Sequence, residues 1–205
     1  MLVVSVKPAK QHLYTISFDD GQQGEIDKTV WEYSALVVGD NLSDEQWQTL
    51  CERSLSHRAR EKALYYLSGR DYGSGELVQK LFRAGIDRPL AQETVSRLCE
   101  CGLIDDARYA SMLARDMQER KLYPKRRVAM ALQEKGFSRE VIAAAVEELD
   151  DTEEEQALAM LRKKRYTACA DAKQREKALG MLARYGFSYT VSARAWSRLE
   201  QEDEE

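Results

Sequence analysis

The sequence predicts a mainly α-helical protein built from three tandem three-helix units, stacked into an elongated curved array behind a small β-rich N-terminal extension. The 205 residues include only 3 Pro and 11 Gly, which favours few loops and many helices. A pattern centred on glycine also recurs, at Gly85, Gly136 and Gly186, with separations of 51 and 50 residues. One unit of this length buries too little apolar surface to be stable alone, so we expect neighbouring units to stack.

The first forty residues predict short strands. Apolar and polar residues alternate with a period of two around Val4–Val6 and over Leu13–Phe18, and Asp19-Asp20-Gly21 is typical of a hairpin turn. A third short strand is expected around Gly24–Ile26. This β-rich extension, residues 1–42, is too small to be stable alone and is expected to pack on the part of the chain that comes after it.

Local signals then predict where the helices begin and end. Ser43 and Gln46 form a capping box, and helical apolar spacing continues from there to about Leu67. Each repeated glycine is the expected left-handed residue after a helix. Two positions later, one residue of each unit is the expected N-cap of the next helix: Asp87, Ser138 and Ser188. The expected boundaries are 43–103 for the first unit with its leading helix, 104–150 for the second, 151–200 for the third and 201–205 for an acidic tail.

Acidic residues stand at the joints between units. In the stretch Gly102–Ala110, capping and the helix dipole explain the pair Asp105-Asp106 better than catalysis does. The run Glu153-Glu154-Glu155 is expected to occupy a first helical turn after a Thr152 cap.

The formal net charge of −4 hides strong local blocks. Residues 147–155 carry a net charge of −7, and residues 156–199 carry +8. Because the Debye length is about 8 Å at physiological salt, such blocks act locally. Lys and Arg on helices often form only a solvated face, the interpretation favoured for Arg88, Arg97 and Arg139. The expected contacts to a partner or to DNA are the clustered cations Arg120, Lys121, Lys125, Arg126, Arg127, Arg162, Lys163, Lys164, Arg165, Lys173 and Lys177.

Other classes of protein lack support in the sequence. There is no phosphate-binding glycine-rich loop, no metalloprotease motif and no supported nucleophile–base pair, so we expect neither an enzyme nor a cofactor. The cysteines and histidines lack zinc-site spacing, so we expect reduced thiols and no metal: Cys51, Cys99, Cys101, Cys169, His12 and His57. No apolar run approaches about 18 residues and no signal peptide is evident, so we expect a cytoplasmic protein without membrane contact.

Three stretches carry a resemblance to a known family. They are Leu67-x-x-Arg70 followed by Glu76-Leu77-x-x-Lys80-Leu81, the joint Gly102-Leu103-Ile104-Asp105-Asp106-x-Arg108-Tyr109-Ala110, and Leu132-x-x-Lys135-Gly136-Phe137. Together they resemble the RecX family of bacterial regulators of the RecA recombinase, over about residues 58–200. The chain departs from the family pattern at Gly73, where Ser is usual, and at Leu122-Tyr123-Pro124, where Gly is frequent.

The resemblance implies a monomeric protein that binds the RecA filament on single-stranded DNA. It would modulate, and mainly inhibit, the recombinase, ATPase and coprotease activities of RecA in recombination and DNA repair. The alternative is a helical-repeat protein that binds DNA, single- or double-stranded, or RNA directly through its basic third unit. Under both hypotheses we expect five tyrosines to serve core or inter-unit packing rather than base stacking: Tyr65, Tyr66, Tyr72, Tyr109 and Tyr166.

Overall fold

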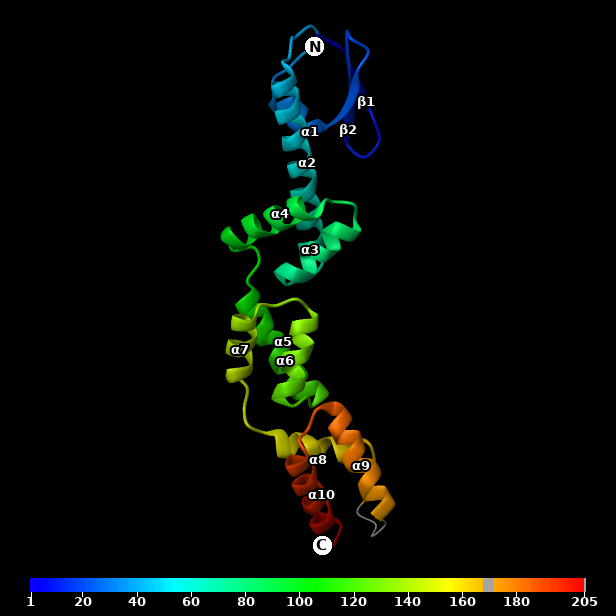
Figure 1. Cartoon of the computed structure of the whole chain (residues 1–205), viewed down its shortest axis with the longest axis vertical. Coiled ribbons are helices and arrows are strands. Elements are labelled where there is room, and N and C mark those ends of the chain that lie inside the picture. Colours follow the sequence, from blue (N-terminus) through cyan, green and yellow to red (C-terminus); the bar gives the residue numbers. More distant parts are fainter. Residues whose placement is uncertain (168–171, 205) are drawn as a thin grey trace. The chain divides into compact units, whose positions relative to one another are not determined.

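The computed structural model describes residues 1–167 and 172–204, and this part of the chain contains three strands and ten helices (Figure 1). Its contacts divide the chain into two compact units. The N-terminal unit comprises Met1–Asp71 with Leu77–Cys101, and the C-terminal unit comprises Tyr72–Glu76 with Gly102–Glu205. The predicted mainly helical fold with a small N-terminal sheet is confirmed.

The N-terminal unit begins with a three-stranded antiparallel sheet in the order β1 (Val3–Pro8), β2 (Leu13–Phe18) and β3 (Gln23–Asp27). Asp27 then caps the short helix α1 (Lys28–Tyr33) by accepting hydrogen bonds from the amides of Thr29 and Val30. The inward residues of the alternating pattern, such as Ile16 and Ile26, are fully buried. The three predicted strands are confirmed.

A long helix connects this sheet to the first helical unit. The predicted capping box of Ser43 and Gln46 starts α2 (Asp44–Leu67), which packs on β3 and α1 near its start and also contacts α4 (Arg88–Glu100). The helix between these two in the sequence, α3 (Ser74–Arg83), buries Leu77 and Leu81 completely. The extension is therefore stabilised by packing on the first helix that comes after it.

The C-terminal unit contains two further sets of three helices, drawn in Figure 1. The first set is α5 (Asp106–Lys121), α6 (Lys125–Glu134) and α7 (Arg139–Glu147). The second set is α8 (Glu153–Lys163), α9 (Ala172–Tyr185) and α10 (Tyr189–Glu204). Within each set every helix contacts the other two, so each set has its own apolar core.

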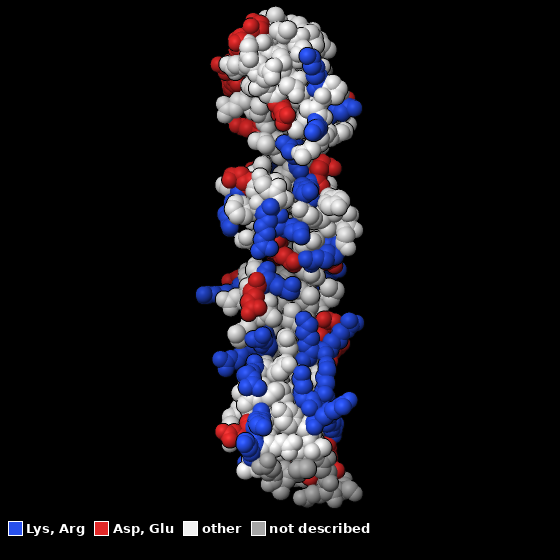
Figure 2. All heavy atoms as spheres, turned by 90° about the vertical axis from the view of Figure 1, so that its right-hand side faces the viewer, with Lys and Arg blue, Asp and Glu red and all other residues white. Residues whose placement is uncertain are grey.

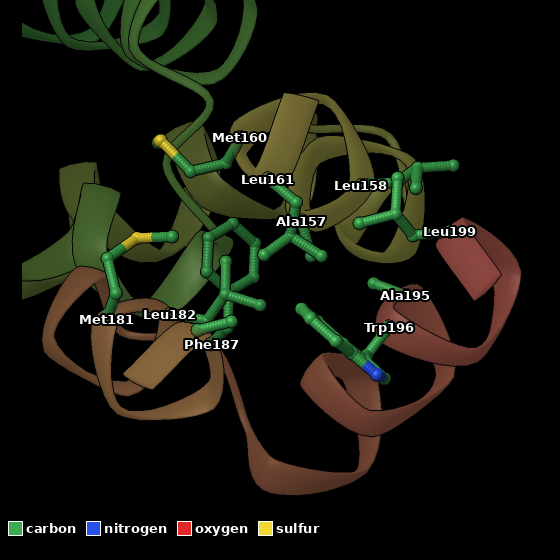
Figure 3. Close-up of a cluster of buried hydrophobic side chains, with 11 residues drawn as sticks. Ala157, Leu158, Met160, Leu161, Met181, Leu182, Phe187, Ala195, Trp196 and Leu199 are labelled. Atoms are coloured by element: carbon green, nitrogen blue, oxygen red, sulfur yellow. The ribbon is translucent and has the colours of Figure 1, made fainter. Parts of the chain in front are cut away.

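The core of the last set shows why these helices need one another. Figure 3 shows Trp196 of α10 facing Ala157 and Leu161 of α8, and Leu199 beside Leu158. Leu182 of α9 and Phe187 lie on the other side of this core. The Trp196 side chain is 1% exposed, and its indole Nε1 donates a hydrogen bond to Oε1 of Glu200 at 2.5 Å. Burial of a large aromatic ring among aliphatic side chains supplies much of the stabilisation of such a small core.

Most of the predicted helix-terminating and capping residues are confirmed. Gly85, Gly136 and Gly186 have φ angles of +87°, +87° and +99°, as expected for residues that terminate helices in the left-handed conformation. Ser138 and Ser188 accept hydrogen bonds from the amides of Val141 and Val191, as N-caps do. Asp105 likewise accepts from the amide of Arg108.

Asp87 and Thr152 stand at the predicted N-cap positions, but neither side chain makes a capping hydrogen bond. Asp87 makes no capping hydrogen bond, because Pro89 occupies the second helical position and removes one of the two amides that a cap side chain would bind. Thr152 has φ −111° and ψ 26°, outside the extended geometry of a cap, and its hydroxyl instead accepts a hydrogen bond from the Gln156 side chain.

Two contacts between successive helical sets within the C-terminal unit, which we call joints, have the same arrangement. The start of α3 lies against the glycine after α6: a Cβ built on Gly75 would lie 2.6 Å from the carbonyl oxygen of Gly136. At the next joint, the start of α6 lies against the glycine after α9: a Cβ on Gly186 would lie 3.2 Å from Cβ of Arg127. The second helix of one three-helix set therefore begins against the end of the second helix of the next set.

The prediction that the tyrosines are packing residues holds for only part of the set. Tyr72 and Tyr109 are buried, at 8% and 7% exposure. Tyr65 is 70% exposed, so its assignment to the core is wrong. Its ring lies beside that of Tyr66, with the ammonium group of Lys62 5.5 Å from the Tyr65 ring centroid.

Candidate partner-binding surface

The predicted contact residues all belong to the C-terminal unit. They stand at the end of α5, at the start of α6, at the end of α8 and just after it, and in the first half of α9: Arg120 and Lys121; Lys125, Arg126 and Arg127; Arg162, Lys163, Lys164 and Arg165; and Lys173 and Lys177. Figure 2 shows Lys and Arg side chains gathered over much of one face of this unit. Most of the predicted residues thus lie near helix ends that are far apart in the sequence.

Several of these cations already have acidic partners inside the molecule. The Arg120 guanidinium lies 3.1 Å from Oδ1 of Asp116, and the Lys125 ammonium lies 2.6 Å from Oδ1 of Asp151. Arg162 forms an ion pair with Glu202 near the end of α10. The Lys125 side chain is only 27% exposed, so its charge is the least available of the three to an outside partner.

The acidic run that starts α8 is also occupied internally. Oε1 of Glu153 accepts a hydrogen bond from the backbone amide of Lys125. Glu154 and Glu155 both bind the Arg198 guanidinium, at 3.2 and 3.5 Å, and the hydrogen bond to Glu154 contributes most to raising the pKa of Arg198 above its usual value. Glu154 and Glu155 therefore link α8 to α10, whereas Glu153 links α8 to the start of α6.

Seven predicted cations form no ion pair with a carboxylate in the part of the chain that the structure describes. We call them the open cations: Lys121, Arg126, Arg127, Lys163, Lys164, Arg165 and Lys177. All are exposed except Arg127, which is half-buried. Lys173 is exposed in the first turn of α9. Because no internal carboxylate compensates the open cations, their charge is available to phosphates or to acidic protein surfaces.

Two tyrosines that the sequence-based prediction missed lie among the open cations. The rings of Tyr123, between α5 and α6, and Tyr185, at the end of α9, have centroids 6.4 Å apart. Lys121 and Arg127 lie 5.8 and 5.7 Å from the Tyr123 centroid, and Lys164 lies 6.0 Å from the Tyr185 centroid. These distances are within the range of cation–π attraction. The tyrosines lie 62 positions apart in the sequence, which conceals the pair, although Tyr185 directly precedes the repeated glycine Gly186.

Outside this basic surface, the described residues provide no second candidate binding site of this kind. In the N-terminal unit, Nδ1 of His57 lies 3.3 Å from Oδ1 of Asp27, and both residues line an open groove of about 890 Å³. Asp27 also caps α1, so its carboxylate has a structural role there. Among the described residues no group of three His, Cys, Asp or Glu side chains is placed to hold a metal ion. None of the helices described is both long enough and apolar enough to span a bilayer.

The cysteines of the described regions form no disulfide bonds. Cys99 and Cys101 are exposed, whereas Cys51 is half-buried and burial raises the pKa of its thiol. A raised pKa disfavours the reactive thiolate. Cys169 lies outside the described residues.

Sequence comparison matches two of the helical sets. The family model for the first three-helix domain of RecX matches residues 59–98, and the model for the second three-helix domain matches residues 105–146. A protein named Regulatory protein RecX from Stenotrophomonas maltophilia is 35% identical over 144 residues, which cover 70% of this chain and 87% of the relative. Its namesake from Streptomyces coelicolor is 33% identical over 152 residues, covering 72% of this chain and 81% of the relative.

Structural comparison extends the likeness to nearly the whole chain. A crystal structure of a regulatory protein RecX superimposes with a TM-score of 0.70 at 21% identity, covering 98% of both chains. The crystal structure of RecX from Lactobacillus salivarius gives a TM-score of 0.61 at 23% identity and covers 72% of this chain and 97% of the other. At these identities the superpositions establish a shared fold. With the matches of both three-helix domains and the 35% identical relative, they lead to one conclusion: this chain belongs to the RecX family.

Proposed function

We propose that this protein is a regulator of the RecA recombinase that binds the filament formed by RecA on single-stranded DNA. It mainly inhibits the ATPase, recombinase and coprotease activities of that filament in recombination and DNA repair. The observation that carries the proposal is membership of a family whose curated relatives are named regulatory proteins. We propose that the protein is a monomer in the cytoplasm. It regulates RecA by binding and not by catalysis.

The charge on the C-terminal unit supports a filament as the partner. A filament on DNA presents both phosphates and protein carboxylates, and either would attract the open cations. Lys163 and Lys164 are the best residues to test, because both are exposed at the end of α8 and neither has a carboxylate partner in the described structure. Neutralising them removes charge without breaking an internal ion pair.

The test is ATP hydrolysis by RecA on single-stranded DNA with increasing amounts of this protein. The wild-type protein is expected to lower the rate, and the double variant Lys163→Gln, Lys164→Gln is expected to need several-fold more protein for the same inhibition. The control is Arg97→Gln, Arg139→Gln, which removes the same charge from α4 and α7. Arg97 pairs with Glu93 on an exposed helix face, so this control is expected to inhibit like the wild type.

The possible outcomes separate function from site. If the wild-type protein neither binds the filament nor changes ATP hydrolysis or strand exchange, the proposed function is wrong. If the wild-type protein inhibits and both double variants inhibit as strongly as the wild type does, the function stands and the assignment of Lys163 and Lys164 is wrong.

A further inference from the structure

We propose that the joint between α6 and α9 contains a binding site for single-stranded DNA, in which bases stack on Tyr123 and Tyr185 and phosphates contact Lys121, Arg127 and Lys164. We call these five residues the tyrosine joint. The proposal deepens the function above and rests on it for one point: the strand is the single-stranded DNA of the filament.

Packing brings the two rings together. Leu122 ends α5 in the left-handed conformation, with φ +56°, and the chain then passes through Tyr123 to the buried Pro124 before α6 begins. A Cβ on Gly186 would lie 3.5 Å from Cγ of Pro124, so the end of α9 is in close contact with the start of α6. Tyr185 directly precedes that glycine and therefore lies next to Tyr123.

The repeat architecture does not require a pair of aromatic rings at such a joint. Counted from the repeated glycines, the joint between α3 and α6 also has a tyrosine, Tyr72, at the position of Tyr123, and a cation, Arg70, at that of Lys121. The second ring is missing there, because the position of Tyr185 is Lys135, and the position of Arg127 is the acid Glu76. The two joints share their backbone design but differ in side chains. An aromatic pair with a positive surrounding is thus a property of the tyrosine joint alone among the two, which indicates a role beyond holding the helices together.

The chemistry of the tyrosine joint suits a single strand. Each ring is half-buried, so its position is held by the core while part of it remains accessible. Lys121 and Lys164 are exposed, and Arg127 is half-buried. Aromatic rings bind the faces of bases, and cations bind the backbone between them. Bases in a duplex are stacked on each other and do not offer these faces, so single-stranded DNA is the expected ligand rather than double-stranded DNA.

The first experiment measures binding of a labelled oligothymidylate of about 20 nucleotides, without RecA, by fluorescence anisotropy. Tyr123→Leu and Tyr185→Leu are each expected to weaken binding about tenfold, within the range found for loss of one base-stacking contact. Tyr123→Phe and Tyr185→Phe keep the ring and are expected to bind within about twofold of the wild type. Thermal unfolding of each variant shows whether the joint remains folded.

A second probe separates stacking from charge. An abasic oligomer of the same length has the phosphates but no bases, so the leucine variants are expected to bind it as well as the wild type does. Lys121→Gln and Lys164→Gln are expected to weaken binding to both oligomers. Each is expected to reduce the slope of log affinity against log salt by about 0.7, the value for one phosphate contact on a single strand. Arg97→Gln, in α4, is the charge-matched control and should leave the slope unchanged.

Three results would overturn the proposal. One is a folded wild-type protein that fails to bind oligothymidylate at low salt. Another is leucine variants that bind oligothymidylate as the wild type does. The third is an equal loss on the abasic and thymidine oligomers, which would mean that the rings act only through the fold. In each case inhibition of the RecA ATPase by the wild type can still be measured, so failure of the tyrosine joint is distinguishable from failure of the regulatory function.

Discussion

The carboxylate of Asp106 caps a helix that starts 32 residues before it, because it accepts both the backbone amide of Ser74 at 2.7 Å and the Ser74 hydroxyl at 2.5 Å. Ser74 is the first residue of α3, and Asp106 is the first residue of α5. The next joint repeats the relationship: Glu153, the first residue of α8, accepts the amide of Lys125, the first residue of α6, at 3.2 Å. Each joint thus satisfies one otherwise unpaired amide at a helix start with an acid from the next set.

Removing this cap should destabilise the protein. Asp106→Ala leaves the Ser74 amide and hydroxyl without their partner and is expected to lower the free energy of unfolding by about 1–2 kcal/mol. Urea denaturation followed by circular dichroism measures the change. Asp116→Ala, which breaks only the exposed pair with Arg120, should cost about 0.5 kcal/mol or less. Equal losses in the two variants would contradict the capping role of Asp106.

A methyl group at the first joint should be strongly unfavourable. A Cβ on Gly75 would lie 2.6 Å from the carbonyl oxygen of Gly136, so Gly75→Ala must push two backbone segments apart. We expect a loss of about 1–3 kcal/mol in unfolding free energy. The matched control is Gly180→Ala in α9, where a Cβ meets nothing within 4 Å. There alanine should stabilise the helix by about 0.5–1 kcal/mol. If both substitutions stabilise, the close approach at Gly75 is wrong.

Burial should decide the effect of losing an aromatic ring from α10. Trp196 is 1% exposed and fills the core between α8 and α10, whereas Tyr189 on the same helix is 72% exposed. Trp196→Ala is expected to lower the unfolding free energy by about 3–5 kcal/mol. Tyr189→Ala should change it by about 0.5 kcal/mol or less. Thermal unfolding of the two variants compares them, and a small effect at Trp196 would contradict the packing described for this core.

The start of α7 predicts a pH effect. The backbone amide of Glu140 and then the side chain of Ser138 lower the pKa of the Glu140 carboxyl by binding its ionised form. A carboxylate stabilised in the folded state contributes stability above its unfolded pKa and loses it as pH falls through the lower folded pKa. Carbon-13 NMR titration should place the Glu140 midpoint below that of an ordinary glutamate, and Ser138→Ala should raise it. A midpoint that Ser138→Ala leaves unchanged would exclude that hydroxyl as a cause.

Local sequence signals were enough to locate the strands and most helix ends. Alternation at Leu13–Phe18, the capping box at Ser43 and the left-handed glycine Gly136 are each readable over a few residues, because hydrogen bonds and backbone conformation at these points are local. The repeated glycine register and the family likeness rest on the same local signals. Asp87 stands at the predicted N-cap, and its side chain makes no capping hydrogen bond for an equally local reason, the proline two residues later.

Which charges and rings are available to a partner depends instead on tertiary packing. Lys125 and Arg162 look like Lys163 in the sequence, yet they pair with Asp151 and Glu202 while Lys163 remains open in the described structure. Tyr123 and Tyr185 likewise meet only because α6 begins against the glycine directly after α9. Coulomb attraction and ring contact depend on distances of a few ångströms. Those distances between residues far apart in the chain are set by packing and not by sequence separation.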